Sequence, residues 1–177
     1  QAQAAGIELD MAYEFAPDEE FGFADLAMAF VGTWTNKRVF QSTPTDIARD
    51  CVGTYSVNCD QGIQPEFQWT VRTTLGFEGV DVSLLWRHID GSEFEGGGLF
   101  QGTPIGFTSQ EDFSTIPAYN YFDVTTRFDL MENLTVTLTV QNIFNKQPPI
   151  VGSDAGPVAF NSGNTFPSTY DALGRKR

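Results

Sequence analysis

Hydrophobic and polar residues alternate one by one over six stretches of the chain. In the clearest stretch, the odd-numbered residues from Ile7 to Phe15 are all apolar or aromatic, whereas most of the even-numbered ones are acidic. A period of two is typical of a β-strand with one apolar and one polar face. The pattern predicts strands over residues 6–16, 23–35, 67–77, 80–89, 119–130 and 134–143, and residues 170–177 are expected to begin a seventh.

The connections between the predicted strands alternate in length. Short turns are expected at residues 17–20, 78–79 and 131–133, and long connections at residues 36–66, 90–118 and 145–169. Transmembrane β-barrels have short turns on one side and long loops on the other, and their tilted strands need about 9–11 residues. A soluble sandwich or a lipocalin, which is the alternative, has no physical reason to sort its loops by side.

The two faces of the predicted strands differ in charge and in aromatic content. Charged residues fall on the polar face, and four of them are expected to line a lumen: Arg72, Arg87, Asp123 and Arg127. The apolar face, expected to point to lipid, includes Leu26, Phe30, Val71, Leu84, Val124 and Leu138. A soluble sandwich also keeps charge off one face. However, the rings on the apolar face gather near the strand ends, as in the two aromatic belts of a membrane barrel. We therefore favour a membrane barrel.

The overall composition narrows the possible functions. The chain carries 23 Asp and Glu against 10 Lys and Arg, a net charge of −13, which argues against nucleic acid as a partner. The mean hydropathy is −0.21, and no apolar run reaches the roughly 18 residues of a membrane helix. The sequence starts at Gln1 with no leader, so we expect an internal piece or a processed chain.

The two cysteines, Cys51 and Cys59, are close together in a stretch rich in Gly, Asn, Asp and Ser. A small disulfide-closed loop is the simplest interpretation, and it implies an oxidising compartment. Two free thiols are the alternative.

Three segments near the C-terminal end resemble one family of proteins. Residues 134–149, LTVTLTVQNIFNKQPP, resemble the penultimate strand of TonB-dependent receptors, which ends in Asn-aliphatic-Phe-Asn/Asp-Lys/Arg before prolines. Tyr121-Phe122-Asp123-Val124 resembles the aromatic-Asp-aliphatic start of the preceding strand in that family. Tyr170-Asp171-Ala172-Leu173-Gly174-Arg175 is similar to the Tyr-Asp-x-x-Gly-Arg that leads into its last strand. The cysteine loop is also similar to a loop in one branch of these receptors.

The resemblance implies an all-β fold in which residues 1–177 form part of one barrel domain. That part would be six antiparallel strands and a stub of a ~22-stranded plugged barrel in the bacterial outer membrane. Such receptors take up a siderophore, vitamin or carbohydrate. They are driven by a TonB-type energy-coupling protein that contacts an N-terminal region absent here, as are the plug and the last strand. No cofactor and no enzymatic activity are expected. A passive porin or adhesin-like barrel is the alternative function.

Such a piece, taken alone, cannot close a barrel. We therefore expect an open sheet with two unpaired edges and an exposed apolar face, which aggregates or requires detergent.

The long connection over residues 90–118 carries the candidate ligand-binding residues. Carboxylates could accept hydroxyls or cations and rings could stack, so the candidates are Glu93, Phe94, Glu95, Phe100, Phe107, Glu111 and Asp112. The alternative is a solvated charged loop with a small aromatic cluster of its own. The fixed spacing of a known calcium loop is absent.

This part of the chain also carries residues for two other chemistries. A glycosidase pair such as Glu93 and Glu111 would need a preorganised geometry that the surrounding glycines disfavour. A metal site at His88 with Asp90 and Glu93 lacks a closed ligand set, so His88 is interpreted as an interfacial ring.

Overall fold

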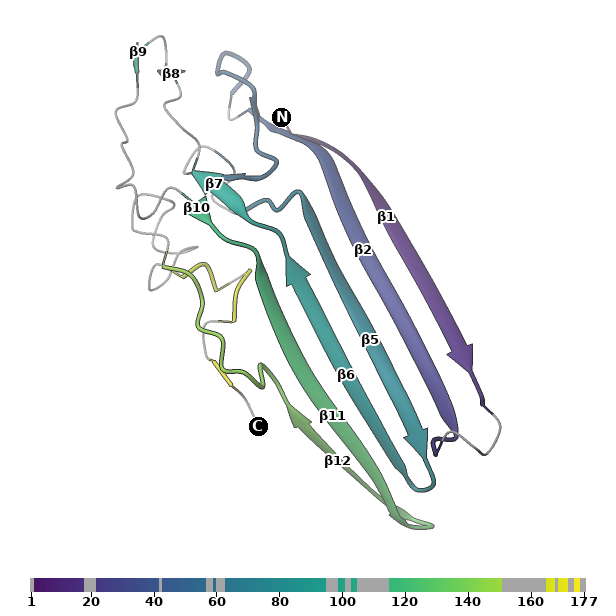
Figure 1. The fold of residues 1–177 in the computed structure, drawn as a ribbon. Coiled ribbons are helices and arrows are strands. Elements are labelled where there is room, and N and C mark those ends of the chain that lie inside the picture. The colour runs from purple at the N-terminus through teal and green to yellow at the C-terminus, as the bar shows by residue number, and fades with distance from the viewer. Residues whose placement is uncertain are drawn as a thin grey trace.

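The computed structural model describes residues 2–17, 22–41, 43–56, 59, 63–94, 99–100, 103–104, 115–150, 165–167, 169–171 and 174–175. Its main feature is one antiparallel sheet whose long strands lie side by side in chain order (Figure 1). These strands are β1 (Ala2–Phe15), β2 (Asp25–Phe40), β5 (Phe67–Phe77), β6 (Val80–Ile89), β11 (Tyr119–Met131) and β12 (Leu134–Val140). All six predicted strands are confirmed. The sheet is open, with β1 and β12 at its edges.

Two strand boundaries differ from those that alternation predicts. β2 continues to Phe40 because residues 2–5 of β1 pair with it, beyond a register shift between Ala5 and Gly6. The two-residue strand β3 (Arg49–Asp50) then pairs with the extended end of β2. β12 ends at Val140, three residues early, because Asn142 adopts a φ of 49° and turns the chain. Among the described residues there is no helix with the length and apolarity that a membrane crossing requires.

The connections are sorted to opposite ends of the sheet, as predicted. β5 and β6 are joined by Glu78 and Gly79, and β11 and β12 by Glu132 and Asn133. Gly79 has a φ of 72°, which only glycine adopts without strain in such a turn. Figure 1 shows both turns at one end of the sheet, whereas the connections from β2 to β5 and from β6 to β11 lie at the other. Most of the predicted turn at residues 17–20 lies outside the described residues.

The strand register fixes which side chains share a face. Directly opposed residues of antiparallel strands point to the same side of a sheet. Val71 pairs with Phe30 and Trp86, whereas Arg72 pairs with Ala29 and Leu85. The pairings of all the neighbouring strands place the residues predicted to point to lipid on one face, here called the apolar face: Leu26, Phe30, Val71, Leu84, Val124 and Leu138. The other, the polar face, carries Arg72, Arg87, Asp123 and Arg127.

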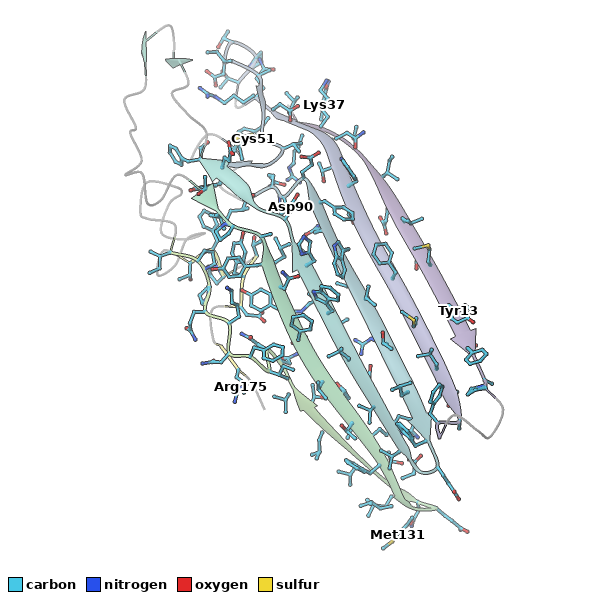
Figure 2. The ribbon with its side chains drawn as sticks, viewed as in Figure 1. Tyr13, Lys37, Cys51, Asp90, Met131 and Arg175 are labelled. Atoms are coloured by element: carbon cyan, nitrogen blue, oxygen red, sulfur yellow. A yellow bond between two sulfur atoms is a disulfide. The ribbon has the colours of Figure 1, made fainter. Side chains whose placement is uncertain are left out.

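The apolar face is exposed across the width of the sheet, and side chains project from it along each strand (Figure 2). Ile7 is 65% exposed at one edge and Leu138 is 59% exposed at the other. Large apolar residues that are well exposed on this face include Ile7, Leu9, Met11, Tyr13, Phe15, Met28, Trp34, Phe77, Leu84, Trp86, Leu134 and Leu138. The expected open sheet with an uncovered apolar face is therefore confirmed.

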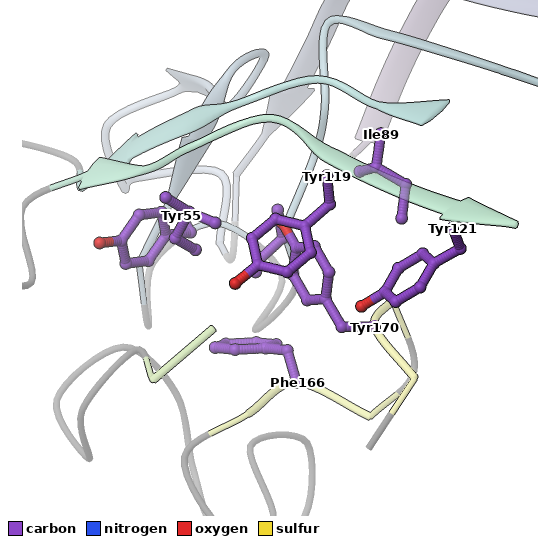
Figure 3. Close-up of a cluster of buried hydrophobic side chains, with 8 residues drawn as sticks. Tyr55, Ile89, Tyr119, Tyr121, Phe166 and Tyr170 are labelled. Atoms are coloured by element: carbon purple, nitrogen blue, oxygen red, sulfur yellow. The ribbon is translucent and has the colours of Figure 1, made fainter. Parts of the chain in front are cut away.

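The buried hydrophobic cluster lies elsewhere, next to the polar face at the long-connection end (Figure 3). A small sheet of β4 (Thr54–Tyr55), β7 (Ser92–Phe94) and β10 (Thr115–Ile116) contributes to it. Its members are Tyr55, Ile63, Ile89, Ile116, Tyr119, Tyr121, Phe166 and Tyr170, and we call it the tyrosine cluster. The remaining strands, β8 (Leu99–Phe100) and β9 (Thr103–Pro104), pair with each other.

Candidate functional site

A row of aromatic rings crosses the apolar face near the long-connection end. Trp69 lies 4.7 Å from Trp86 between ring centroids, and Trp86 stacks on Phe122 at 5.4 Å. The row extends from β2 to the segment after β12, and its members are Phe30, Trp34, Phe67, Trp69, Trp86, Phe122 and Phe144. The rings therefore form one connected strip that crosses the apolar face from strand to strand.

His88 belongs to this aromatic row. Its ring stacks on Trp69 at 5.2 Å, and its Nδ1 lies 3.0 Å from Oδ1 of Asn120. The indole N–H of Trp86 donates to the same Asn120 oxygen at 2.8 Å. One oxygen of Asn120 thus contacts the polar edges of both Trp86 and His88. Within the described residues, no three His, Cys, Asp or Glu side chains come together as a possible metal site.

The polar face carries a network of charged residues near the same end of the sheet as the aromatic row. Arg87 donates from Nη2 to Asp171 at 2.8 Å, and its Nε lies 3.3 Å from Oδ2 of Asp123. The guanidinium also lies over the Tyr121 ring, 5.1 Å from its centroid. We call Arg87, Asp123 and Asp171 the Arg87 network. Alternation predicted the face of Arg87 and Asp123, but it gave no signal for Asp171, which is 84 residues away from Arg87.

The Asn-Ile-Phe-Asn-Lys segment folds into a turn that supports this network. Asn142 is 1% exposed, and its side chain both accepts from the Lys146 N–H at 2.8 Å and donates to the Lys146 carbonyl at 2.9 Å. Its backbone N–H donates to Asp123 at 2.8 Å. Asn142 and Asn145 both have positive φ, a conformation that asparagine tolerates better than most residues. This turn therefore shapes the end of β12 and ties it to Asp123.

The C-terminal segment packs on the polar face instead of starting a seventh strand. Residues 170–171 and 174–175 are not in strand conformation, which makes that prediction wrong for the described part of the stretch. Tyr170 is 2% exposed and lies 5.0 Å from Tyr119 between ring centroids. The Asp171 N–H donates to the Tyr121 hydroxyl at 3.3 Å. Packing of Tyr170 in the tyrosine cluster and the ion pair between Asp171 and Arg87 anchor this segment on the polar face.

Burial in the tyrosine cluster opposes ionisation of its phenols. It raises the pKa of Tyr55 to about 12 and also raises the pKa of Tyr170. An unfolded tyrosine ionises near pH 10, so folding favours the neutral phenol. The stabilisation is fully present below about pH 10 and is lost as the pH rises through the folded pKa.

Alkaline titration should therefore unfold the cluster as its phenols ionise. We expect Tyr55 and Tyr170 to ionise well above pH 10, in step with loss of the near-ultraviolet circular dichroism of the cluster. Phenolate absorbance measures the ionisation, and Tyr55→Phe should remove one late-titrating group. If both phenols ionised near pH 10 with the folded spectrum intact, the cluster would not be buried as described.

The predicted disulfide between Cys51 and Cys59 is confirmed. The two Cα atoms are 5.5 Å apart, and both cysteines are buried beside the extended end of β2. A bridge between cysteines 8 residues apart in sequence stabilises the folded chain by about 2–3 kcal/mol in the chain-entropy view.

The structure places only part of the predicted ligand loop. Glu93 is exposed on β7, opposite Thr54 and Thr115. Phe94 contacts Tyr55 edge-on at 5.5 Å, and therefore packs against the tyrosine cluster. The backbone of Phe100 lies in β8. Four of the candidates fall outside the described residues: Glu95, Phe107, Glu111 and Asp112. The ligand-binding role of the whole loop therefore stays a prediction.

The aromatic row and the Arg87 network thus lie on opposite faces of the same end of the sheet. The other two arginines predicted to line a lumen also have polar neighbours on this face: Arg72 donates to Ser83 at 3.2 Å, and Arg127 lies 3.2 Å from Asp129. Comparison with protein families, curated proteins and solved structures finds no match to this chain.

Proposed function

We propose that this chain is part of the wall of a bacterial outer-membrane β-barrel that takes up a small ligand with energy coupling. The observation that carries this proposal is the apolar face, which is uncovered from β1 to β12. Soluble domains bury such a face against a second layer. They rarely expose an apolar patch larger than a few hundred Å². A bilayer supplies the missing layer.

The dimensions of the sheet fit a membrane. β6 has 10 residues, which at about 3.3 Å per residue extend roughly 33 Å. Tilted by about 40°, such a strand spans about 25 Å, the height of the apolar band on an outer-membrane barrel. The aromatic row then lies at one border of the band, next to the long connections. The polar face would turn its ion pairs toward a lumen, where charge is tolerated.

The proposed uptake role rests on the receptor-like segments. The Asn-Ile-Phe-Asn-Lys turn is a built element, since Asn142 is buried and bonded at its backbone and side chain. In TonB-dependent receptors, an upstream plug and a coupling segment add energy-driven transport. A passive barrel would lack them, so the full-length coding sequence distinguishes these two functions.

Reconstitution tests the membrane part of this proposal. We expect the purified chain to sediment as aggregate without detergent and to keep β-sheet circular dichroism in micelles. After detergent removal in the presence of phosphatidylcholine vesicles, it should float with the vesicles and resist extraction by high salt and alkaline carbonate. A monodisperse, detergent-free protein that stays out of the vesicles would show that the apolar face is not a lipid surface.

A further inference from the structure

A cavity of about 290 Å³ opens on the polar face over β2, β5 and β6, near the long-connection end. Two cross-strand rows of side chains line it, together with Trp69 and His88 from the row between them. One row is Val31, Thr70 and Arg87, and the other is Thr33, Gln68 and Ile89. The rows are adjacent on one face, so residues from three separate stretches of sequence surround one space.

The cavity offers hydrogen-bonding groups that the protein itself leaves unused. In the described part of the chain, the side chains of Thr33, Gln68 and Thr70 make no hydrogen bond. The hydrogen bonds of Arg87 come from Nη2 to Asp123 and Asp171, and none involves Nη1. Two hydroxyls, one amide and one edge of a guanidinium are therefore available to a ligand.

The charges around the cavity favour an uncharged ligand. Two carboxylates outnumber the one guanidinium of Arg87, so the network is negative overall and Asp123 and Asp171 would repel an anion. Both carboxylates are already paired with Arg87, so a cation in the cavity would lie beside the guanidinium and not beside an unpaired carboxylate. Val31, which is 37% exposed, adds apolar surface beside the polar groups, whereas Ile89 is 9% exposed and packs in the tyrosine cluster. Polar groups that fix orientation next to apolar contacts are the usual pattern of a small-molecule site.

We propose that this cavity is a subsite for a neutral sugar ring. The hydroxyls of the ring would bond to Gln68, Thr70 and Arg87, and its C–H groups would contact Val31. The volume is near the ~300 Å³ lower end of ligand pockets, which suits one ring. The inference that the sugar is the transported substrate rests on the proposed function. It selects carbohydrate from the three ligand classes named above, which are siderophore, vitamin and carbohydrate.

The test is binding of three matched monosaccharides to the full chain in lauryldimethylamine oxide micelles, a detergent without a sugar head group. We expect saturable saturation-transfer NMR signals from glucose, and clearly weaker binding of glucosamine and glucuronate. Gln68→Leu and Thr70→Val should each weaken glucose binding about ten-fold through loss of a ligand hydrogen bond. Thr137→Val, on the same face of the distant strand β12, is the matched control and should bind as the wild type does.

Three results would overturn the sugar subsite: no glucose binding, equal or tighter binding of a charged analogue, or unchanged binding by Gln68→Leu. Vesicle flotation of the same preparation separates this failure from that of the membrane proposal. A protein that floats but binds no glucose loses only the subsite. A protein that binds glucose through Gln68 but stays out of vesicles loses only the membrane role.

Discussion

Leu138→Arg should prevent stable insertion of the sheet into a bilayer, whereas Thr137→Arg should leave insertion nearly unchanged. The two residues are neighbours on β12, both are exposed, and their side chains point to opposite faces. An arginine on the lipid face near the bilayer midplane costs about 2–4 kcal/mol. That cost corresponds to a shift of roughly 30- to 1,000-fold in the insertion equilibrium.

Comparison of Leu138→Arg with Thr137→Arg also distinguishes a sheet that lies in a membrane from one that lies in water. In water, both arginines would be solvated, and neither would change stability by more than about 0.5 kcal/mol. The measurement is the fraction of each variant that floats with vesicles, together with urea unfolding of the vesicle-bound protein. Equal behaviour of the two variants would contradict the assignment of the apolar face to lipid.

Alternation in the sequence was sufficient to predict the six strands and their faces. A strand repeats every two residues, so each stretch carries its own signal, and the environment on each side selects the residue type. Arg72 and Val71 are adjacent in sequence, and their separation onto opposite faces follows from this local rule. The short and long connections also alternate along the sequence. Successive connections of an antiparallel sheet in chain order lie at alternate ends, so the short ones gather at one end and the long ones at the other.

Contacts between distant segments could not be predicted in this way. The extension of β2 to Phe40 depends on pairing with the first residues of β1, and residues 36–40 show no clear alternation of their own. The cavity over β2, β5 and β6 appears only once the register places Gln68 beside Thr33. Asp171 likewise reaches Arg87 only through packing of Tyr170 in the tyrosine cluster.

Asp123→Ala should destabilise the sheet more than any other single change in the Arg87 network. The side chain of Asp123 is 8% exposed, and its carboxylate accepts the Asn142 N–H at 2.8 Å while pairing with Arg87. Its removal leaves a buried backbone donor without its partner and leaves Arg87 with Asp171 alone. Breaking a buried ion pair costs about 3–5 kcal/mol. Because Arg87 is 28% exposed, solvent screening lowers the expectation to about 2–3 kcal/mol.

Two further variants resolve this loss into its parts. Asp123→Asn keeps an oxygen for the Asn142 N–H but removes the charge, so it should lose about half as much stability as Asp123→Ala. Asp129→Asn alters a carboxylate whose side chain is 46% exposed, bonded to Arg127 and Thr135. It should therefore cost less than about 1 kcal/mol. Urea unfolding in micelles, followed by tryptophan fluorescence, measures all three. If Asp123→Ala were no more destabilising than Asp129→Asn, the Arg87 network would not anchor the Asn142 turn or the C-terminal segment to the sheet.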